Sequence, residues 1–231
     1  MFENLYIVKE PLGFMKVLQF FFAILVFSTT TSFSTQFSFN AKSTECNETN
    51  WVPVTHTVQY PFRLDYESED VVLCEKQNIT HRFAFYGNVS STARFFVAMG
   101  VIAMLVSAGV LIYYCNRDEG NSTPRCVLYD LCLHMAMVAF LFICACAWSD
   151  GVGNLKNRVN PELWVNDLCA PVANLTCQFD SSTNFAGSFG RLNVSLIFGF
   201  LNAFLWGSNL WFVYKERRNT PDPQHDSSSN I

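Results

Sequence analysis

The chain has 231 residues, of which 50% are hydrophobic and 16% aromatic, while only 15% are charged. So apolar a composition is atypical of a soluble domain and favours a membrane protein. The formal net charge is −4 and no long Lys/Arg run occurs, so nucleic acid is excluded as an expected partner.

Four long apolar runs divide the chain, at about residues 14–37, 95–114, 127–148 and 192–213. Each approaches the roughly 20 residues that a helix needs to cross a hydrocarbon core, and a helix satisfies its own backbone hydrogen bonds there. We therefore predict an all-α membrane protein, with a bundle of four transmembrane helices over residues 1–216. A short cytosolic tail over residues 217–231 is polar and is expected to be disordered.

The first run could be a membrane span or a cleaved signal peptide. Lys16, the apolar stretch after it and the small residues 28–32 resemble a signal sequence. Apolar residues resume at Phe33 and Phe37, however, which makes the run longer than an ordinary signal core. We expect an uncleaved span, with Lys16 among the basic residues on its cytosolic side.

Two loops, about residues 38–94 and 149–191, contain cysteines and Asn-x-Ser/Thr sequons. The expected glycosylation sites are Asn47, Asn78, Asn88 and Asn174. Disulfides and N-glycans both form in the secretory lumen or outside the cell. The loops are therefore predicted to be luminal and both termini cytosolic. Two further sequons, at Asn121 in the short cytosolic turn and Asn193 at the fourth run, are expected to stay unmodified.

The loop cysteines are Cys46, Cys74, Cys169 and Cys177. Four cysteines allow three pairings. We expect one disulfide within each loop, Cys46 with Cys74 and Cys169 with Cys177, because local closure does not require the loops to dock first. Free buried thiols are the alternative.

The third run contains a polar pair, Asp130 and His134, four residues apart and therefore on one helix face. One interpretation is a protonatable element that moves ions or protons. The favoured alternative is an interfacial hydrogen bond that ties this helix to its neighbours. No nucleophile with a base, phosphate-binding loop or metal-ligand spacing stands out, so we expect no enzyme activity, no cofactor and no metal site.

The fourth run has small residues every four positions and two asparagines seven apart. These helix-packing or oligomerisation residues are Ser195, Gly199, Asn202, Ala203, Gly207 and Asn209. Small residues let another helix approach closely, and an amide in lipid requires a hydrogen-bond partner. Packing inside one chain is the favoured interpretation, and self-association is the alternative.

Three stretches resemble one family. They are VKEPLGFMKVLQ at 8–19, YPFRL at 60–64, and FGFLN at 198–202 continuing to NLWFVYKE at 209–216. Together they resemble the synaptophysin family, with its synaptophysin, synaptoporin and pantophysin-like members, among the MARVEL-type four-span proteins. The resemblance covers about residues 8–216. The long cytosolic tail of synaptophysin, rich in Tyr, Gly, Pro and Gln, has no counterpart here, which favours a pantophysin-like or divergent member.

The resemblance implies a multi-pass protein of synaptic or other small secretory vesicles that takes part in trafficking and exocytosis. Relatives bind cholesterol, form homo-oligomers, and associate with synaptobrevin-like fusion proteins and the vacuolar proton pump. We expect the same partners for this chain. A loose sterol pattern at Leu111, Tyr113 and Arg117 adds weak local support. The competing hypothesis is a small oligomeric ion channel or pore that uses Asp130 and His134.

Overall fold

The computed structural model describes residues 10–46, 50–74, 76–116, 124–179 and 189–219. The chain forms two compact units. The first, here called the helical unit, comprises Met1–Phe27, Ala98–Ala145 and Ile197–Ile231. The second, here called the strand unit, comprises Ser28–Val97 and Cys146–Leu196.

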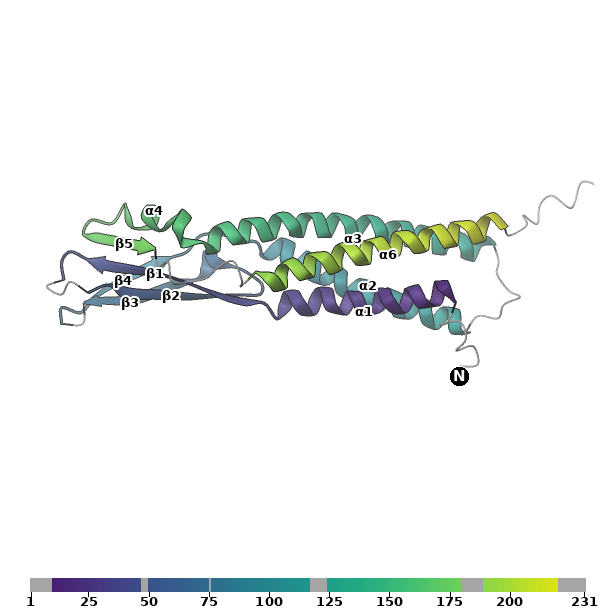
Figure 1. Cartoon of the computed structure of the whole chain (residues 1–231), viewed down its shortest axis with the longest axis horizontal. Helices are drawn as coiled ribbons and strands as arrows, with labels where there is room; N and C mark the ends of the chain where they lie inside the picture. The colour runs from purple at the N-terminus through teal and green to yellow at the C-terminus, as the bar shows by residue number, and fades with distance from the viewer. Residues whose placement is uncertain (1–9, 47–49, 75, 117–123, 180–188, 220–231) are drawn as a thin grey trace, which may run out of the picture. The chain divides into compact units, whose positions relative to one another are not determined.

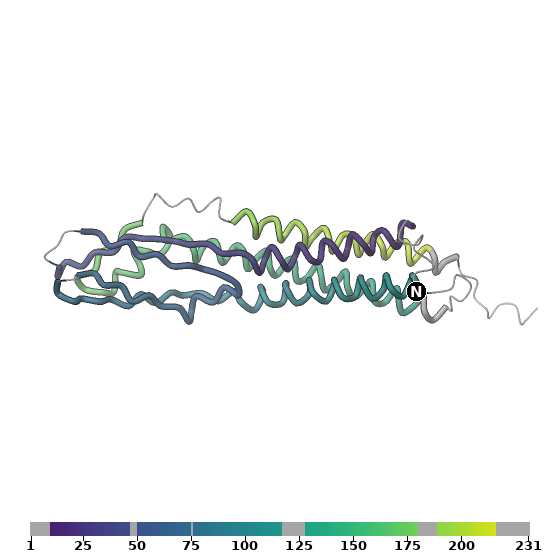
Figure 2. Tube along the Cα trace, turned by 90° about the horizontal axis from the view of Figure 1, so that it is seen from below, coloured from purple at the N-terminus to yellow at the C-terminus, as the bar shows by residue number. Residues whose placement is uncertain are grey.

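Four long helices run alongside one another (Figures 1 and 2). They are α1 (Pro11–Thr31), α2 (Ser90–Asn116), α3 (Pro124–Val159) and α6 (Gly190–Asn219). Proline is the first residue of both α1 and α3, where its fixed φ and missing N–H cost nothing. Within the described residues, all four are long and apolar enough to cross a membrane, as the sequence predicted.

Two predicted span limits differ from the helices. The first run was expected to continue to residue 37, but α1 ends at Thr31 and a strand begins at Ser34. In that strand exposed and buried residues alternate, which is the period of a half-buried strand and not of a helix. The third helix continues well past residue 148 to Val159, because Val152, Leu155 and Val159 form a buried face at helical spacing.

The prediction of an all-α protein was wrong for the loops. Five strands are described: β1 (Ser34–Ser43), β2 (Val52–Gln59), β3 (Ser68–Cys74), β4 (Ile79–Ala84) and β5 (Leu175–Phe179). They form a three-stranded sheet in the order β2-β1-β5 and a separate β3-β4 hairpin, all antiparallel. The alternation in β2, where Val54, His56 and Val58 are buried between exposed residues, is the signal that marks such strands.

The strand β1 brings the two loops together. It pairs with β2 from the first loop and with β5 from the second, so Phe39 lies opposite both Val54 and Phe179. Among its described residues, the unit also has three short helices: η2 (Leu64–Tyr66), η3 (Pro161–Leu163) and α4 (Val165–Cys169). The two loops therefore fold into one body and are not independent connections.

Aromatic side chains form the core of the strand unit. The indole of Trp148 stacks near the rings of Phe62 and Phe96, with centroids 5.8 and 5.9 Å away. The Phe37 ring packs edge-on against Phe85, at 5.3 Å. These side chains are buried almost completely. Burying large rings removes much apolar surface from water and stabilises the unit.

A clamp of polar side chains links the sheet to the hairpin. The buried imidazole of His56 in β2 has Nε2 2.6 Å from Glu67 Oε2 and Nδ1 3.0 Å from Glu69 Oε1. Glu67 precedes β3 and Glu69 lies in it. Because both ring nitrogens face carboxylate oxygens, this one side chain holds the two strand groups together.

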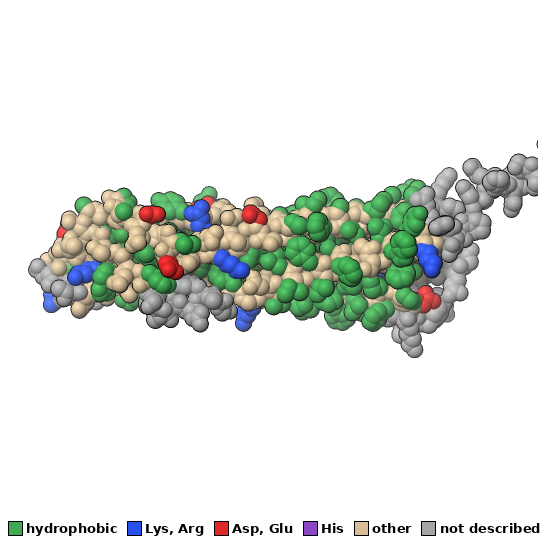
Figure 3. Space-filling view, turned by 45° about the horizontal axis from the view of Figure 1, so that its top comes forward, with side chains coloured by type: hydrophobic (Ala, Val, Ile, Leu, Met, Phe, Trp, Pro, Cys, Tyr) green, Lys and Arg blue, Asp and Glu red, His purple; other side chains and the backbone are tan. Residues whose placement is uncertain are grey.

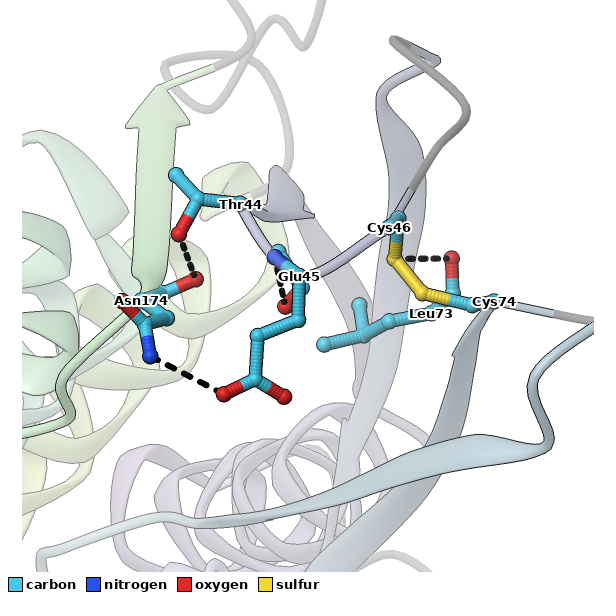
Figure 4. The surroundings of a disulfide bond; sticks show 7 residues. Thr44, Glu45, Cys46, Leu73, Cys74 and Asn174 are labelled. Atoms are coloured by element: carbon cyan, nitrogen blue, oxygen red, sulfur yellow. Dashed lines mark hydrogen bonds between the residues drawn. A yellow bond between two sulfur atoms is a disulfide. The ribbon is translucent and has the colours of Figure 1, made fainter.

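Both predicted disulfides are present, each within its own loop. Cys46 and Cys74 have Cα atoms 5.8 Å apart, and Cys169 and Cys177 have theirs 6.0 Å apart. Figure 4 shows Cys46–Cys74 close to a contact between the loops, where Asn174 Nδ2 donates to Glu45 Oε1 over 2.9 Å. Thr44 N and Oγ1 both donate to the Asn174 carbonyl.

Candidate functional site

The helical unit contains a group of polar side chains, here called the polar cluster, to which all four helices contribute. Its members are Lys16, Gln19, Tyr114, Asp130, His134, Trp206 and Asn209. Lys16, Gln19, His134 and Asn209 are each 0% exposed. Burial of so many polar groups in helices of this apolarity is costly unless they bond to one another.

Lys16 is at the centre of the polar cluster. Its Nζ lies 2.7 Å from His134 Nε2 and 3.0 Å from Gln19 Oε1. It also lies 3.9 Å from the ring centroid of Trp206, a cation–π distance. The ammonium therefore has two hydrogen-bond acceptors and an aromatic face in place of water.

The contacts of His134 define its tautomer. Nδ1 lies 2.8 Å from the Asp130 carbonyl oxygen, and a carbonyl can only accept, so Nδ1 carries the hydrogen. Nε2 is then the acceptor, and it faces two donors, Lys16 Nζ and Asn209 Nδ2, the latter at 3.2 Å. His134 thus receives hydrogen bonds from α1 and α6 while it donates within α3.

Asp130 provides the negative charge opposite Lys16. Its Oδ1 lies 3.2 Å from His134 Nδ1, and its Oδ2 accepts from the Tyr114 hydroxyl over 2.6 Å. The carboxylate thereby connects α3 to α2. One cation and one anion in the same cluster compensate each other, which a low-dielectric interior requires.

The sequence pointed to Asp130, His134 and Asn209 but missed the residue that they surround. Lys16 was expected at the cytosolic edge, whereas it is buried among α1, α3 and α6. A signal did exist: Lys16 and Gln19 are three apart, so they share one face of an otherwise apolar helix. Tyr114 and Trp206 carried no comparable polar signal.

The predicted packing residues of α6 lie mostly inside. Ser195, Gly199, Asn202, Ala203 and Asn209 are buried, whereas Gly207 is half-exposed. Nothing lies within 4 Å of a Cβ built on Gly207. Asn202 is 1% exposed, and neither of its amide atoms has a hydrogen-bond partner among the described residues.

Three of the four predicted glycosylation sites are described, and all are exposed. Asn78 lies in the turn between β3 and β4 with φ of 50°. Asn88 is partly engaged, because its Oδ1 accepts from Ser90 and its Nδ2 donates to Asp65. Asn174 joins the two loops. Asn47 lies outside the described residues.

The weak sterol pattern falls beside an open groove between α2 and α3. The groove measures about 280 Å³, and Gly109, Val110, Tyr113, Tyr129, Asp130 and Leu133 line it. Tyr113 is 48% exposed, Leu111 is half-exposed, and Arg117 lies outside the described residues. Among the described residues, no group of three or more His, Cys, Asp or Glu side chains could hold a metal ion.

The surface of the helical unit is largely apolar, whereas Lys16, Gln19, His134 and Asn209 of the polar cluster are buried inside it. Figure 3 shows hydrophobic side chains gathered over the helical unit, and most of the charged side chains on that face lie over the strand unit. This arrangement, with four helices apolar enough to span a bilayer, defines an integral membrane protein.

The family described as MARVEL, a membrane-associating domain, matches residues 7–212. The chain therefore belongs to the MARVEL family. Such a domain indicates a membrane-associated function, often in vesicle trafficking.

Proposed function

We propose that this protein is a non-enzymatic organiser in the membrane of synaptic or other small secretory and transport vesicles. The observation that carries the proposal is the MARVEL match over residues 7–212, which covers three of the apolar helices and most of the fourth. The resemblance of residues 8–19, 60–64 and 198–216 to the synaptophysin family supports the vesicle assignment. In this role the helical unit associates with lipid and other helices and takes part in trafficking and exocytosis.

The proposed topology places both loops in the vesicle lumen and both termini in the cytosol. Two disulfides in the strand unit support it, because structural disulfides persist in the secretory lumen and not in the cytosol. The exposed sequons at Asn78, Asn88 and Asn174 agree with the same side. The protein is accordingly proposed to be a glycoprotein.

The proposed lipid partner is cholesterol, and the α2–α3 groove is the site that supports it. Val110, Leu133 and the rings of Tyr113 and Tyr129 give this open groove an apolar wall for a sterol. The Asp130 carboxylate offers an acceptor for the sterol hydroxyl. The proposed protein partners, a synaptobrevin-like helix, the vacuolar proton pump and further copies of this chain, come from the family resemblance. Gly207 supports them, because the open space beside it leaves room for another helix.

The ion channel or pore hypothesis has less support. A pore between subunits would require the Asp130–His134 pair to line the water path. His134 is instead fully buried within one chain, and its Nε2 accepts hydrogen bonds from Lys16 and Asn209. The geometry favours a structural tie between helices.

Proximity labelling tests the proposed function. The labelling enzyme is fused to the cytosolic tail in secretory cells, and small vesicles are then purified. We expect enrichment of synaptobrevin-like proteins and proton-pump subunits. Labelling confined to plasma-membrane junction proteins would overturn the vesicle assignment. The D130N variant separates the two hypotheses, since an organiser keeps its vesicle targeting whereas a pore changes its conductance.

A further inference from the structure

The strand unit contains a cavity of about 180 Å³ that no part of the proposed function uses. Leu64, Phe85, Trp164 and Leu168 form its apolar walls, and the charged residues Arg158 and Asp167 also line it. Apolar walls with a few polar groups are the usual composition of a small-molecule site. Its size suits a ligand with a single ring.

The indole wall is held in place by its own contacts. Trp164 Nε1 donates to the Arg158 carbonyl over 2.9 Å. The indole also packs edge-on against Phe37 and Phe85, with centroids 5.6 and 6.3 Å away. Because this ring is fixed from both sides, the wall is formed before any ligand enters.

Gly87 positions both Arg158 and Leu64. Its φ of +131° is a conformation that side chains rarely adopt, and a Cβ there would lie 3.1 Å from Arg158 Cγ. The stem of Arg158 therefore runs over the bare Gly87 backbone. The Gly87 carbonyl accepts from Leu64 N over 3.0 Å, which fixes the opposite wall.

The helix α4 supplies the remaining wall, with Asp167 and Leu168. Leu168 N donates to the Trp164 carbonyl over 2.9 Å, and the next residue, Cys169, is bonded to Cys177 in β5. A disulfide directly beside the cavity restricts the movement of that wall.

The two charges are available to a ligand. Arg158 and Asp167 are both exposed, and within the described residues neither side chain forms an ion pair. A guanidinium recognises a carboxylate, and a carboxylate recognises an ammonium. The cavity thus presents one charge of each sign beside aromatic walls.

We propose that this cavity binds a small zwitterion with an aromatic body, of which a free aromatic amino acid is the simplest example. The ring enters the cavity and packs against Trp164 and Phe85, which both line it and offer aromatic contacts. The ligand carboxylate pairs with Arg158 and its ammonium with Asp167. This inference does not depend on the proposed vesicle function.

The proposal is tested by titrating small probes into the full-length protein in nanodiscs. Calorimetry and saturation-transfer NMR detect the binding. The probes are L-phenylalanine, phenethylamine, which lacks the carboxylate, and 3-phenylpropionate, which lacks the ammonium. We expect L-phenylalanine to bind saturably and each analogue at least about tenfold more weakly, since each loses one charge-assisted contact.

Two variants assign the charges. R158Q should weaken L-phenylalanine about tenfold and leave phenethylamine unchanged, whereas D167N should weaken L-phenylalanine and leave 3-phenylpropionate unchanged. R82Q is the matched control, because Arg82 is an exposed arginine of the same unit, 72% exposed, and should leave all three probes unaffected. L168W fills the cavity and should abolish binding, with disulfide mapping as the check on folding.

The proposal is overturned if no probe binds saturably, if the analogues bind as tightly as L-phenylalanine, or if neither charge variant changes binding.

Discussion

At the scale of residues, the polar cluster shows how a lysine is accommodated within an apolar bundle. A charged side chain in a membrane helix costs up to about 2.5–3.5 kcal/mol on insertion scales at the helix centre, and less toward a helix end, where Lys16 lies in α1. Lys16 offsets this cost through His134, Gln19 and the face of Trp206. Because the contacts come from three helices, the cluster specifies how those helices meet as well as neutralising one charge.

We expect H134L to destabilise the protein by about 3 kcal/mol, because Lys16 and Asn209 both lose their acceptor and the lysine stays buried. K16M/H134L should recover most of that loss, since it removes the charge together with its partner. Unfolding in one detergent, followed by circular dichroism, measures both variants.

The matched control for this pair is H81L, since His81 in β4 is half-exposed. Its effect should be small. A double variant less stable than H134L alone would contradict the role assigned to Lys16.

Two glycines of α3 make a second test at the residue scale. A Cβ on Gly151 would lie 2.7 Å from Thr92 Oγ1 and 3.1 Å from Trp148, whereas nothing lies within 4 Å of one on Gly153. G151A should therefore cost about 1–3 kcal/mol through overpacking. G153A should stabilise the helix by up to about 1 kcal/mol. Equal melting temperatures for the two variants would show that Gly151 is not closely packed.

At the scale of elements, the strand unit depends on links between segments that are far apart in the chain. β1 pairs with β5 from the other loop, His56 joins β2 to the β3 segment, and Asn174 contacts Thr44 and Glu45. The His56 link spans only 11 to 13 residues, whereas the Asn174 contacts span 129 and 130, and closing such long loops costs more entropy. The disulfides reduce that cost by restricting the unfolded chain.

The two disulfides should differ in their contribution to stability. The Cys46–Cys74 bond closes a separation of 28 residues and the Cys169–Cys177 bond one of 8. The chain-entropy relation then gives about 3.6 and about 2.5 kcal/mol. We expect C46S/C74S to melt below C169S/C177S, measured on the full chain in nanodiscs. The reverse order would mean that α4 packing, and not loop length, controls the unit.

At the scale of the whole molecule, the two units differ in surface chemistry. The helical unit exposes large apolar side chains such as Phe21, Leu105 and Phe204, each more than half exposed. The strand unit contains both disulfides and exposes the sequons at Asn78, Asn88 and Asn174. An apolar surface of this kind is suited to lipid, and the strand unit is suited to an oxidising aqueous compartment.

The proposed topology predicts which sequons are glycosylated. Asn78, exposed in a hairpin turn, should be occupied, so N78Q should lower the apparent mass by one glycan. N193Q is the control and should change nothing, because Asn193 lies at the start of α6, where Lys156 Nζ donates to its Oδ1. A tag on the C-terminus should be digested by protease added to intact vesicles. A protected tag would reverse the proposed orientation.

The four long apolar helices and the cysteines of the two disulfides could be predicted from the sequence, because apolar length and cysteine spacing are local properties of the chain. How the loop strands pair into sheets, and that Lys16 is buried, could be seen only in the folded chain. The pairing of β1 with β5 and the contact of Lys16 with His134, 118 residues away, depend on which distant segments meet. The hydropathy pattern does not reveal which distant segments come into contact. It is the same whether a lysine near a helix end is hydrated or is buried beside an imidazole.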